Sequence, residues 1–178
     1  MRYILAQIFG FSAMGLMIAT YQFKRHRTLM LLMVICSGLW CAHYASLGLF
    51  TPVIMNVINV ARGIVYSFRE KKWVQTWLIP AAFLIISSVA VFLTWENVWS
   101  LLPFAASVSA TLANWQKDTR KLKILTLPVC LCWFFYNMIN RSIAGMANEA
   151  FTLTSIIVAL LRQKNSSRKE EIPSGGEC

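Results

Sequence analysis

Long apolar runs, broken by short polar segments, dominate the pattern of this chain. Each run holds about 20 residues, which in an α-helix is enough to cross the ~30 Å hydrocarbon core of a bilayer. The runs lack the period-two alternation of barrel strands. Because only helices and closed barrels satisfy their backbone in lipid, the pattern predicts an all-α membrane protein. We expect seven transmembrane helices, over residues 3–22, 28–48, 51–68, 73–94, 97–115, 122–140 and 144–161.

Four prolines fall within these runs and test the helical prediction. Pro52 is expected in the first turn of its helix, where a missing N–H costs little. Pro80, Pro103 and Pro128 are expected inside their helices. An internal proline should bend or break a helix unless neighbouring groups restore its backbone bonds.

Composition and charge support a membrane location. The chain is 57% hydrophobic and 13% charged, with a formal net charge of +10. A nucleic-acid-binding protein would gather this charge on one face of a soluble fold. Here Lys and Arg form short runs between the apolar stretches, which is typical of membrane loops. We therefore expect the lipid bilayer as the main partner and no nucleic acid.

The basic residues also predict an orientation. They follow the first, third, fifth and seventh runs, and the other loops hold few charges. Positive loops stay in the cytoplasm, so we predict a multi-pass protein of the bacterial inner membrane with its N-terminus outside and its C-terminus inside. Residues 164–178 have little apolar content and are predicted to be a disordered cytoplasmic tail. The residues concerned include Lys24, Arg25, Arg27, Arg69, Lys71, Lys72, Lys117, Arg120, Lys121, Lys123, Arg162 and Lys164.

The chain also repeats itself. Residues 1–70 and 96–163 carry matched features in the same order, and residues 71–95 supply one spanning helix between them. This predicts two parallel three-helix bundles joined by a linker helix, a 3+1+3 plan that places any site between the halves near the midplane. The matched pairs are Tyr21-Gln22 with Trp115-Gln116, Trp40 with Trp133, Tyr44 with Asn137, and Asn56 with Glu149.

Polar side chains within the apolar runs are the candidates for chemistry. In lipid such groups need a partner or a water-filled cavity. Two interpretations stay open: they hold the helices together, with Arg62 and Glu149 in an ion pair or in separate hydrogen bonds, or they line a cavity that binds a solute. For the second we select a substrate-binding set of Trp40, His43, Asn59, Arg62, Trp133, Asn137, Glu149 and Thr152.

Motifs of enzyme chemistry are missing from the sequence. It has no phosphate loop, nucleophile elbow or zinc-protease helix, so we expect neither an enzyme nor a cofactor or metal. Intramembrane catalysis stays open as a third alternative, since Glu149 and His43 are acid–base groups, although no nucleophile accompanies them. The oligomeric state, including a homo-oligomer, is also left open.

The second half of the chain resembles the YgjV-type bacterial inner-membrane proteins, as does Asn59-x-x-Arg62 in the first half. The resemblance covers about residues 3–162 and implies a fold and a compartment rather than a function. It rests on Leu101-Leu102-Pro103, Ser109, Trp133, Asn137, Ser142-Ile143, Gly145 and Glu149.

A more distant similarity is to the SWEET and PQ-loop transporters. Their Pro-Gln pairs at the ends of helices one and five look like Tyr21-Gln22 and Trp115-Gln116, without the prolines. Their pocket-lining Trp and Asn pairs would correspond to Trp40 with Trp133 and Asn59 with Thr152. The resemblance implies movement of a small polar solute by alternating access. The alternative is a sensor, assembly or structural membrane protein that transports nothing.

Overall fold

The computed structural model describes residues 1–20, 26–68, 70–116 and 118–170. Within these ranges it contains helices and no strand, which confirms the all-α prediction. The first half of the repeat motif, Tyr21-Gln22, lies outside the described residues. The elements are α1 (Arg2–Thr20), α2 (His26–Ser46), α3 (Phe50–Ser67), α4 (Leu78–Leu93), the 3₁₀ turn η1 (Val98–Ser100), α5 (Leu101–Trp115), α6 (Thr119–Ile139) and α7 (Ile143–Glu170).

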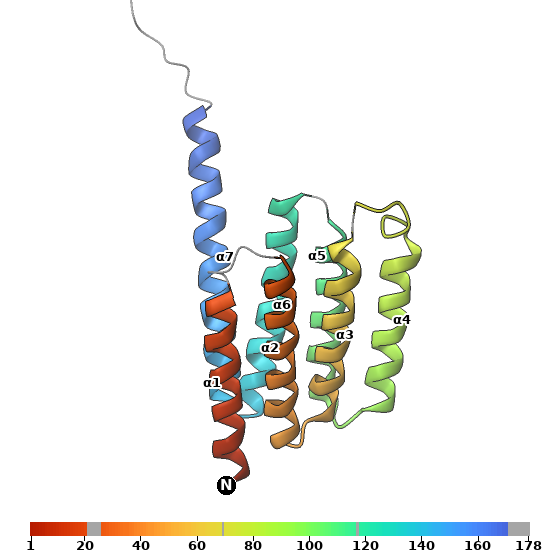
Figure 1. Ribbon diagram of the computed structural model, residues 1–178, viewed down its shortest axis with the longest axis vertical. Helices are drawn as coiled ribbons and strands as arrows, with labels where there is room; N and C mark the ends of the chain where they lie inside the picture. Colours follow the sequence, from red (N-terminus) through yellow and green to blue (C-terminus); the bar gives the residue numbers. More distant parts are fainter. Residues whose placement is uncertain (21–25, 69, 117, 171–178) are drawn as a thin grey trace, which may run out of the picture.

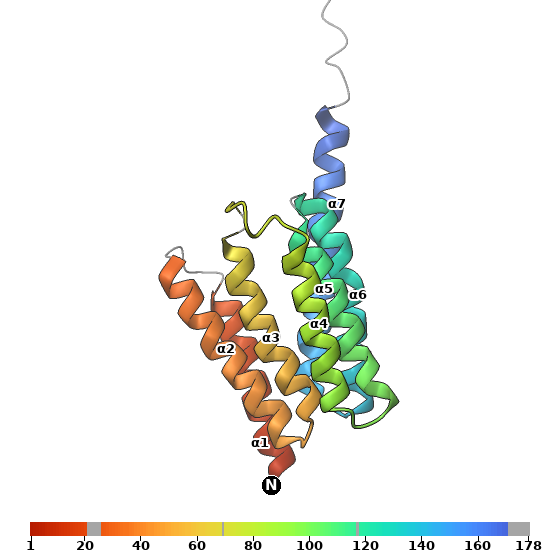
Figure 2. The ribbon, with the colours of Figure 1, turned by 90° about the vertical axis from the view of Figure 1, so that its right-hand side faces the viewer.

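Successive helices run up and down in one bundle, so the odd-numbered helices point the same way (Figure 1). Helix α2 packs between α1 and α3, and α6 packs between α5 and α7. These two sets meet where α3 packs on α5 and where α1 packs on α7. Helix α4 packs on α3 and α5 and lies at one edge of the bundle (Figures 1 and 2).

The expectation that Pro80 and Pro103 interrupt their helices is wrong. Each is the third residue of its helix, as Pro52 is in α3. The first four N–H groups of a helix have no partner within it, so a proline there removes no bond. Pro128 does lie inside α6, as expected.

The helix ends that differ most from the predicted spans are the start of α4 and the end of α7. Helix α4 begins at Leu78 rather than at residue 73, because turns occupy the polar segment before it. Helix α7 continues to Glu170, so residues 164–170 are helical where we expected disorder. Lys, Arg, Gln and Glu are good helix formers, and adding residues to an existing helix is cheap. Residues 171–178 of the predicted tail lie outside the described residues.

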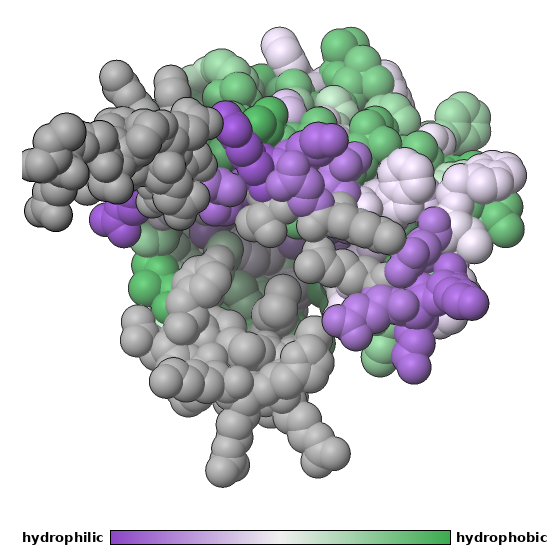
Figure 3. Space-filling model, turned by 90° about the horizontal axis from the view of Figure 1, so that it is seen from above, coloured by the Kyte–Doolittle hydropathy of each residue, from purple (hydrophilic) through white to green (hydrophobic). Residues whose placement is uncertain are grey.

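The outer surface suits a lipid environment. In the part of the chain searched, three segments are long and apolar enough to span a membrane: Arg2–Ala19, Arg120–Ile139 and Ile143–Gln163. The shorter apolar helix α4 carries exposed Trp77 before it and exposed Trp95 after it, as interfacial anchors do. Seen from the end where α3 and α5 finish, hydrophilic residues gather over the loops (Figure 3), where Lys71, Lys72 and Arg120 are exposed.

Candidate functional site

A small polar pocket lies between four helices of the bundle. Its volume is about 150 Å³, below the ~300–1,000 Å³ of drug-sized ligand sites. Two residues from each of α2, α3 and α7 and one from α6 form its walls. They are Trp40, Tyr44, Asn56, Asn59, Trp133, Asn148 and Glu149.

Three aromatic rings make one wall of this pocket. The ring of Tyr44 lies between those of Trp40 and Trp133, with centroids 5.9 Å from each. The interplanar angles of 28° and 31° place the three rings in a tilted stack. Ring faces carry a negative quadrupole, so this wall suits a cation or the apolar face of a polar solute.

The opposite walls carry amides and one carboxylate. Asn59 Oδ1 accepts a hydrogen bond from the Arg62 guanidinium, which leaves the two N–H groups of that amide for the pocket. On α7, Asn148 Nδ2 donates to Glu149 Oε1 at 3.1 Å. Asn56 Nδ2 donates to the Pro52 carbonyl at 3.0 Å, which leaves its oxygen as an acceptor. The α3 wall thus offers donors and acceptors, and the α7 wall offers the Glu149 carboxyl group.

Arg62 itself lies behind the pocket, buried where α3 packs on α5. Its Nη1 donates to the Ser107 carbonyl at 2.9 Å, the Ser107 hydroxyl at 3.2 Å and the Thr111 hydroxyl at 2.8 Å. Within the described part of the chain all its acceptors are neutral oxygens, so Arg62 and Glu149 make separate hydrogen bonds, the second of the two predicted alternatives, and not an ion pair. Its role toward the pocket is indirect, because it fixes how the Asn59 amide is turned.

His43 is fully buried beside the pocket, with its ring 5.3 Å from that of Trp40 and 4.9 Å from that of Tyr44, and it links three parts of the chain. Its Nδ1 lies 2.6 Å from the Ala6 carbonyl and its Nε2 lies 2.7 Å from Ser142 Oγ. A carbonyl only accepts, so Nδ1 carries the hydrogen; Nε2 of the neutral ring then accepts from the Ser142 hydroxyl. Ser142 Oγ also accepts from the Gly145 N–H at 3.2 Å. His43 therefore holds α1, α2 and the α6–α7 turn together.

Asn137 lies next to the pocket rather than in its lining. Its Oδ1 accepts from the Tyr44 hydroxyl at 3.0 Å, and its buried Nδ2 has no partner among the described residues. Gly145 packs directly against it, since a Cβ at Gly145 would overlap the Asn137 amide. A glycine is required there for α7 to approach α6 this closely.

Thr152 faces a different cavity, a groove of about 460 Å³ between α1 and α7. Its hydroxyl donates to the Asn148 carbonyl at 2.9 Å. Of the predicted set, the structure thus brings four residues together in the pocket: Trp40, Asn59, Trp133 and Glu149. The other four, His43, Arg62, Asn137 and Thr152, do not line it.

Three lining residues were not in the predicted set: Tyr44, Asn56 and Asn148. The sequence contained signals for two of them, Asn56 and Tyr44. Asn56 is three residues before Asn59, so both lie on one helix face. Tyr44 and Asn56 also belong to matched pairs of the repeat.

The residues around the pocket indicate what it can bind. A hydrogen-bonding pocket with one carboxylate and three aromatic rings can hold a small polar solute. Within the part of the chain searched, no group of three or more His, Cys, Asp or Glu could hold a metal ion.

Comparison with known proteins places the chain in a family. Residues 4–167 match a family model described as bacterial inner membrane protein, Imp-YgjV. No curated protein and no solved structure matches the chain. The match spans nearly all of the helical bundle and agrees with its apolar exterior. This chain therefore belongs to the Imp-YgjV family of bacterial inner membrane proteins.

Proposed function

We propose that this protein moves a small polar solute across the inner membrane by alternating access between two parallel three-helix repeats, with α4 as the linker. One observation carries the proposal: the polar pocket lies where matched residues of the two halves meet. Trp40 and Trp133 both line it, as do Asn56 and Glu149. A site between two repeats is the arrangement that alternating access requires.

Matched residues also contact one another, as expected near a two-fold axis. When two copies are related by such an axis, equivalent residues approach each other across it. Tyr44 and Asn137 are equivalent positions of the repeat, and the tyrosine hydroxyl donates to the asparagine oxygen. The rings of Tyr44 and Trp133 are also in contact.

The start of each half caps a helix of the other half. Glu96, just before α5, accepts from the N–H groups of Phe50 at 2.7 Å and Thr51 at 3.4 Å at the start of α3. In α1, Gln7 Oε1 accepts from the Ala144 N–H at 2.9 Å at the start of α7. Thr51 and Ala144 are equivalent at the offset that relates Asn56 to Glu149. This reciprocal exchange supports a repeated plan.

The walls of the pocket indicate the kind of solute. Glu149 favours a solute with positive charge or several hydrogen-bond donors, and the Asn59 amide favours one with an acceptor. The aromatic wall suits an ammonium group or a flat apolar face. The volume of about 150 Å³ limits the solute to a few heavy atoms. A small amine or amino alcohol meets all of these conditions.

Flux into proteoliposomes tests the proposal. We expect uptake of ethanolamine or a similar small amine by the intact protein. Glu149→Gln and Asn59→Ala should each reduce uptake at least ~10-fold, since the first removes the charge that pairs with an amine and the second removes a hydrogen bond to the solute. Asn140→Ala is the matched control, because Asn140 bonds only to the Tyr136 carbonyl in the described contacts. Unchanged uptake in both pocket variants would overturn the site.

Fusion reporters test the orientation that the basic loops predict. A fluorescent protein fused to the C-terminus should fluoresce, and an alkaline phosphatase fused there should be inactive, because the positive loops stay in the cytoplasm. The opposite pair of results would reverse the topology.

A second candidate is a structural or sensory membrane protein. The observation that favours it is the number of buried polar groups that join helices. Arg62 links α3 to α5, and His43 links α2 to α1 and the α6–α7 turn. If intact protein moves no small polar solute, and its loss leaves small-molecule pools unchanged inside and outside cells, this second function is the better one.

A further inference from the structure

The carboxyl group of Glu149 lines the central pocket without a positively charged partner. It accepts a hydrogen bond from Asn148 Nδ2 at 3.1 Å, and the thiol of Cys130 on α6 interacts with it from the neighbouring helix. In the part of the chain that the structure describes, no Lys or Arg forms an ion pair with it. An ionised carboxylate held away from water without a cation is costly. Either a proton or a bound cation removes this cost.

The titratable groups of α2 and α6 that face Glu149 supply no positive charge. From α2 the Tyr44 hydroxyl faces it, and this hydroxyl already donates to Asn137 at 3.0 Å. From α6 the facing group is the Cys130 thiol. Lys123 of α6 lines the groove between α1 and α7 instead. It precedes Cys130 by seven residues, which is about 10 Å along a helix.

The cations of α1 and α3 also lie elsewhere. The guanidinium of Arg62 on α3 is turned to neutral oxygens of α5. The charged and titratable side chains of α1 are Arg2 and Tyr3, both in its first turn, and the Tyr3 hydroxyl donates to the Arg141 carbonyl at 3.0 Å. The only charged side chain that lines the central pocket is therefore that of Glu149.

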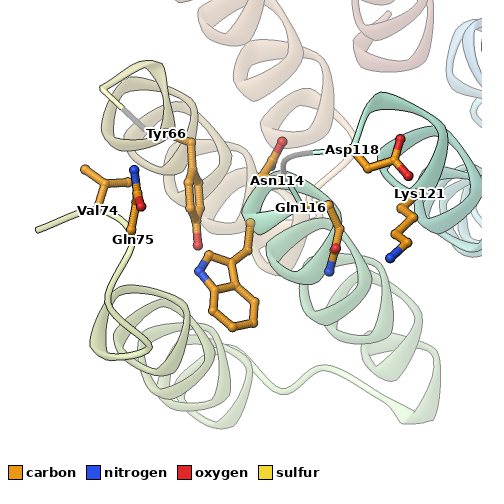
Figure 4. Close-up of a pocket in the computed structure, with 8 residues that line it drawn as sticks. Tyr66, Val74, Gln75, Asn114, Gln116, Asp118 and Lys121 are labelled. Carbon is orange, nitrogen blue, oxygen red and sulfur yellow. The ribbon is translucent and has the colours of Figure 1, made fainter. Parts of the chain in front are cut away.

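Another carboxyl group that lines a cavity has a different environment. Asp118 lies in a cavity of about 460 Å³ at the end of the bundle where α3 and α5 finish. In Figure 4 its carboxylate lies on the same side of the cavity as the Lys121 side chain. It is exposed, and one of its oxygens accepts from the Arg120 N–H at 2.8 Å. Asp118 thus has water and a cation nearby, whereas Glu149 is partly buried among neutral groups.

His43 is the second group near the pocket that could carry a proton, but its contacts are already complete. Its Nδ1 lies 2.6 Å from the Ala6 carbonyl and its Nε2 lies 2.7 Å from Ser142 Oγ. It is fully buried and does not line the pocket, so a bound solute would not touch it. Glu149 is the titratable group that a solute in the pocket would reach.

We propose that Glu149 holds a proton when the pocket is empty and releases it when a small amine binds, so that the protein exchanges protons for its solute. The inference rests on the proposed function and adds the proton as a second substrate. The O–H bond of the carboxyl group breaks, the proton leaves with pocket water, and the carboxylate pairs with the incoming ammonium group. The site has no net charge before or after the exchange, which suits a group inside a membrane.

Infrared spectroscopy of the purified whole protein tests whether Glu149 holds a proton. The protein is kept in a maltoside detergent, which has no carbonyl group, near pH 7, where an exposed carboxyl group is ionised. We expect the C=O stretching band of a protonated carboxyl group in the intact protein and its loss in Glu149→Gln. Asp118→Asn is the matched control and should keep the band, since asparagine also caps a helix.

Absence of this band from the intact protein, or a band that Glu149→Gln leaves unchanged, would contradict the proposal. If Glu149→Gln does not fold, Glu149→Asp replaces it. That variant keeps a carboxyl group one carbon closer to the backbone, so the band should shift. A band at the unchanged position would then belong to another residue.

Calorimetric titration with ethanolamine tests the exchange itself. Near pH 7 an alkyl amine is already a cation, so protons released on binding come from the protein. Titrations in two buffers with different enthalpies of ionisation give their number. We expect about one proton per ethanolamine bound, the same number in Asp118→Asn, and loss of the carboxyl band on binding. Any binding that remains in Glu149→Gln should release none.

The outcomes separate this inference from the proposed transport. Binding or uptake of ethanolamine without proton release would remove the exchange and leave transport in place. A protein that shows the Glu149 band but neither binds nor moves ethanolamine would remove the transport of a small amine and the exchange with it. The protonated carboxyl group would then be a structural feature of the helix bundle.

Discussion

The two interfaces between the first and second halves of the chain differ in the side chains that form them. Where α3 packs on α5, buried Arg62 bonds to Ser107 and Thr111, and Ser107 bonds on to Ser87 of α4 at 2.9 Å. Where α7 packs on α1, the position that the predicted repeat matches to Arg62 is Ser155, which is exposed beside a groove of about 460 Å³. One interface is joined by a buried cation, and the other is open along part of its length.

This difference in side chains affects which of the two interfaces can separate more easily. The hydrogen bonds from the Arg62 guanidinium to Ser107 and Thr111, both on α5, must break together if α3 separates from α5. At the α1–α7 interface the groove is lined mainly by apolar side chains, among them Met17 and Phe151. Such side chains can move past one another without breaking hydrogen bonds. Asn148 lines both this groove and the central pocket. We expect the α1–α7 interface to open first in any rearrangement that reaches the pocket.

The largest effect should come from removing Arg62. Arg62→Ala should lower the free energy of unfolding by about 3 kcal/mol, because it leaves a cavity and removes the bonds between α3 and α5. Ser155→Ala at the equivalent position should change it by less than about 0.5 kcal/mol, as exposed substitutions do. Unfolding titrations in mixed micelles measure both.

Arg62→Met serves as the control, since it keeps most of the side-chain volume and removes the hydrogen bonds together with the charge. If Arg62→Ala and Ser155→Ala cost the same, the contrast between the two interfaces is not real.

A smaller effect should follow from adding a methyl group where α1 lies closest to α7. A Cβ at Gly10 would lie 2.6 Å from the Ala144 Cβ and 2.8 Å from His43 Nδ1. Gly10→Ala should therefore cost about 2 kcal/mol. Gly15→Ala, in the same helix with no atom within 4 Å of the added Cβ, should be neutral or stabilising by up to about 1 kcal/mol.

Thermal unfolding of the two glycine variants side by side gives the measurement. Equal losses would show that α1 and α7 are not in close contact at Gly10.

The smallest effects should come from the reciprocal caps. Glu96→Ala removes the acceptor for two N–H groups at the start of α3, and Gln7→Ala removes the acceptor for one at the start of α7. We expect losses of about 1.5 and about 1 kcal/mol in the free energy of unfolding. Hydrogen exchange at Thr51 and Ala144 should rise only in the matching variant. A rise at both sites in either variant would contradict separate caps.

The sequence predicted more of the fold than of the site, and particular residues show why. Trp40 and Trp133 were found because large aromatic residues at matched positions are visible in a repeat. His43 and Tyr44 are adjacent on α2, yet His43 bonds to α1 and the α6–α7 turn whereas Tyr44 faces the pocket. Helical periodicity gives the angle between two side chains. It does not say which neighbouring helix lies at that angle.

Seven apolar runs, the helices that they form and the polar residues within them were readable from the sequence alone. Membrane helices are recognisable in a sequence because a segment that spans lipid must satisfy its own backbone hydrogen bonds and carry apolar side chains on its outside. Only the tertiary structure decided that Arg62 binds neutral oxygens of α5, that Thr152 faces a separate groove, and that Pro80 and Pro103 begin their helices. These outcomes depend on contacts between segments far apart in the chain, which no local pattern specifies.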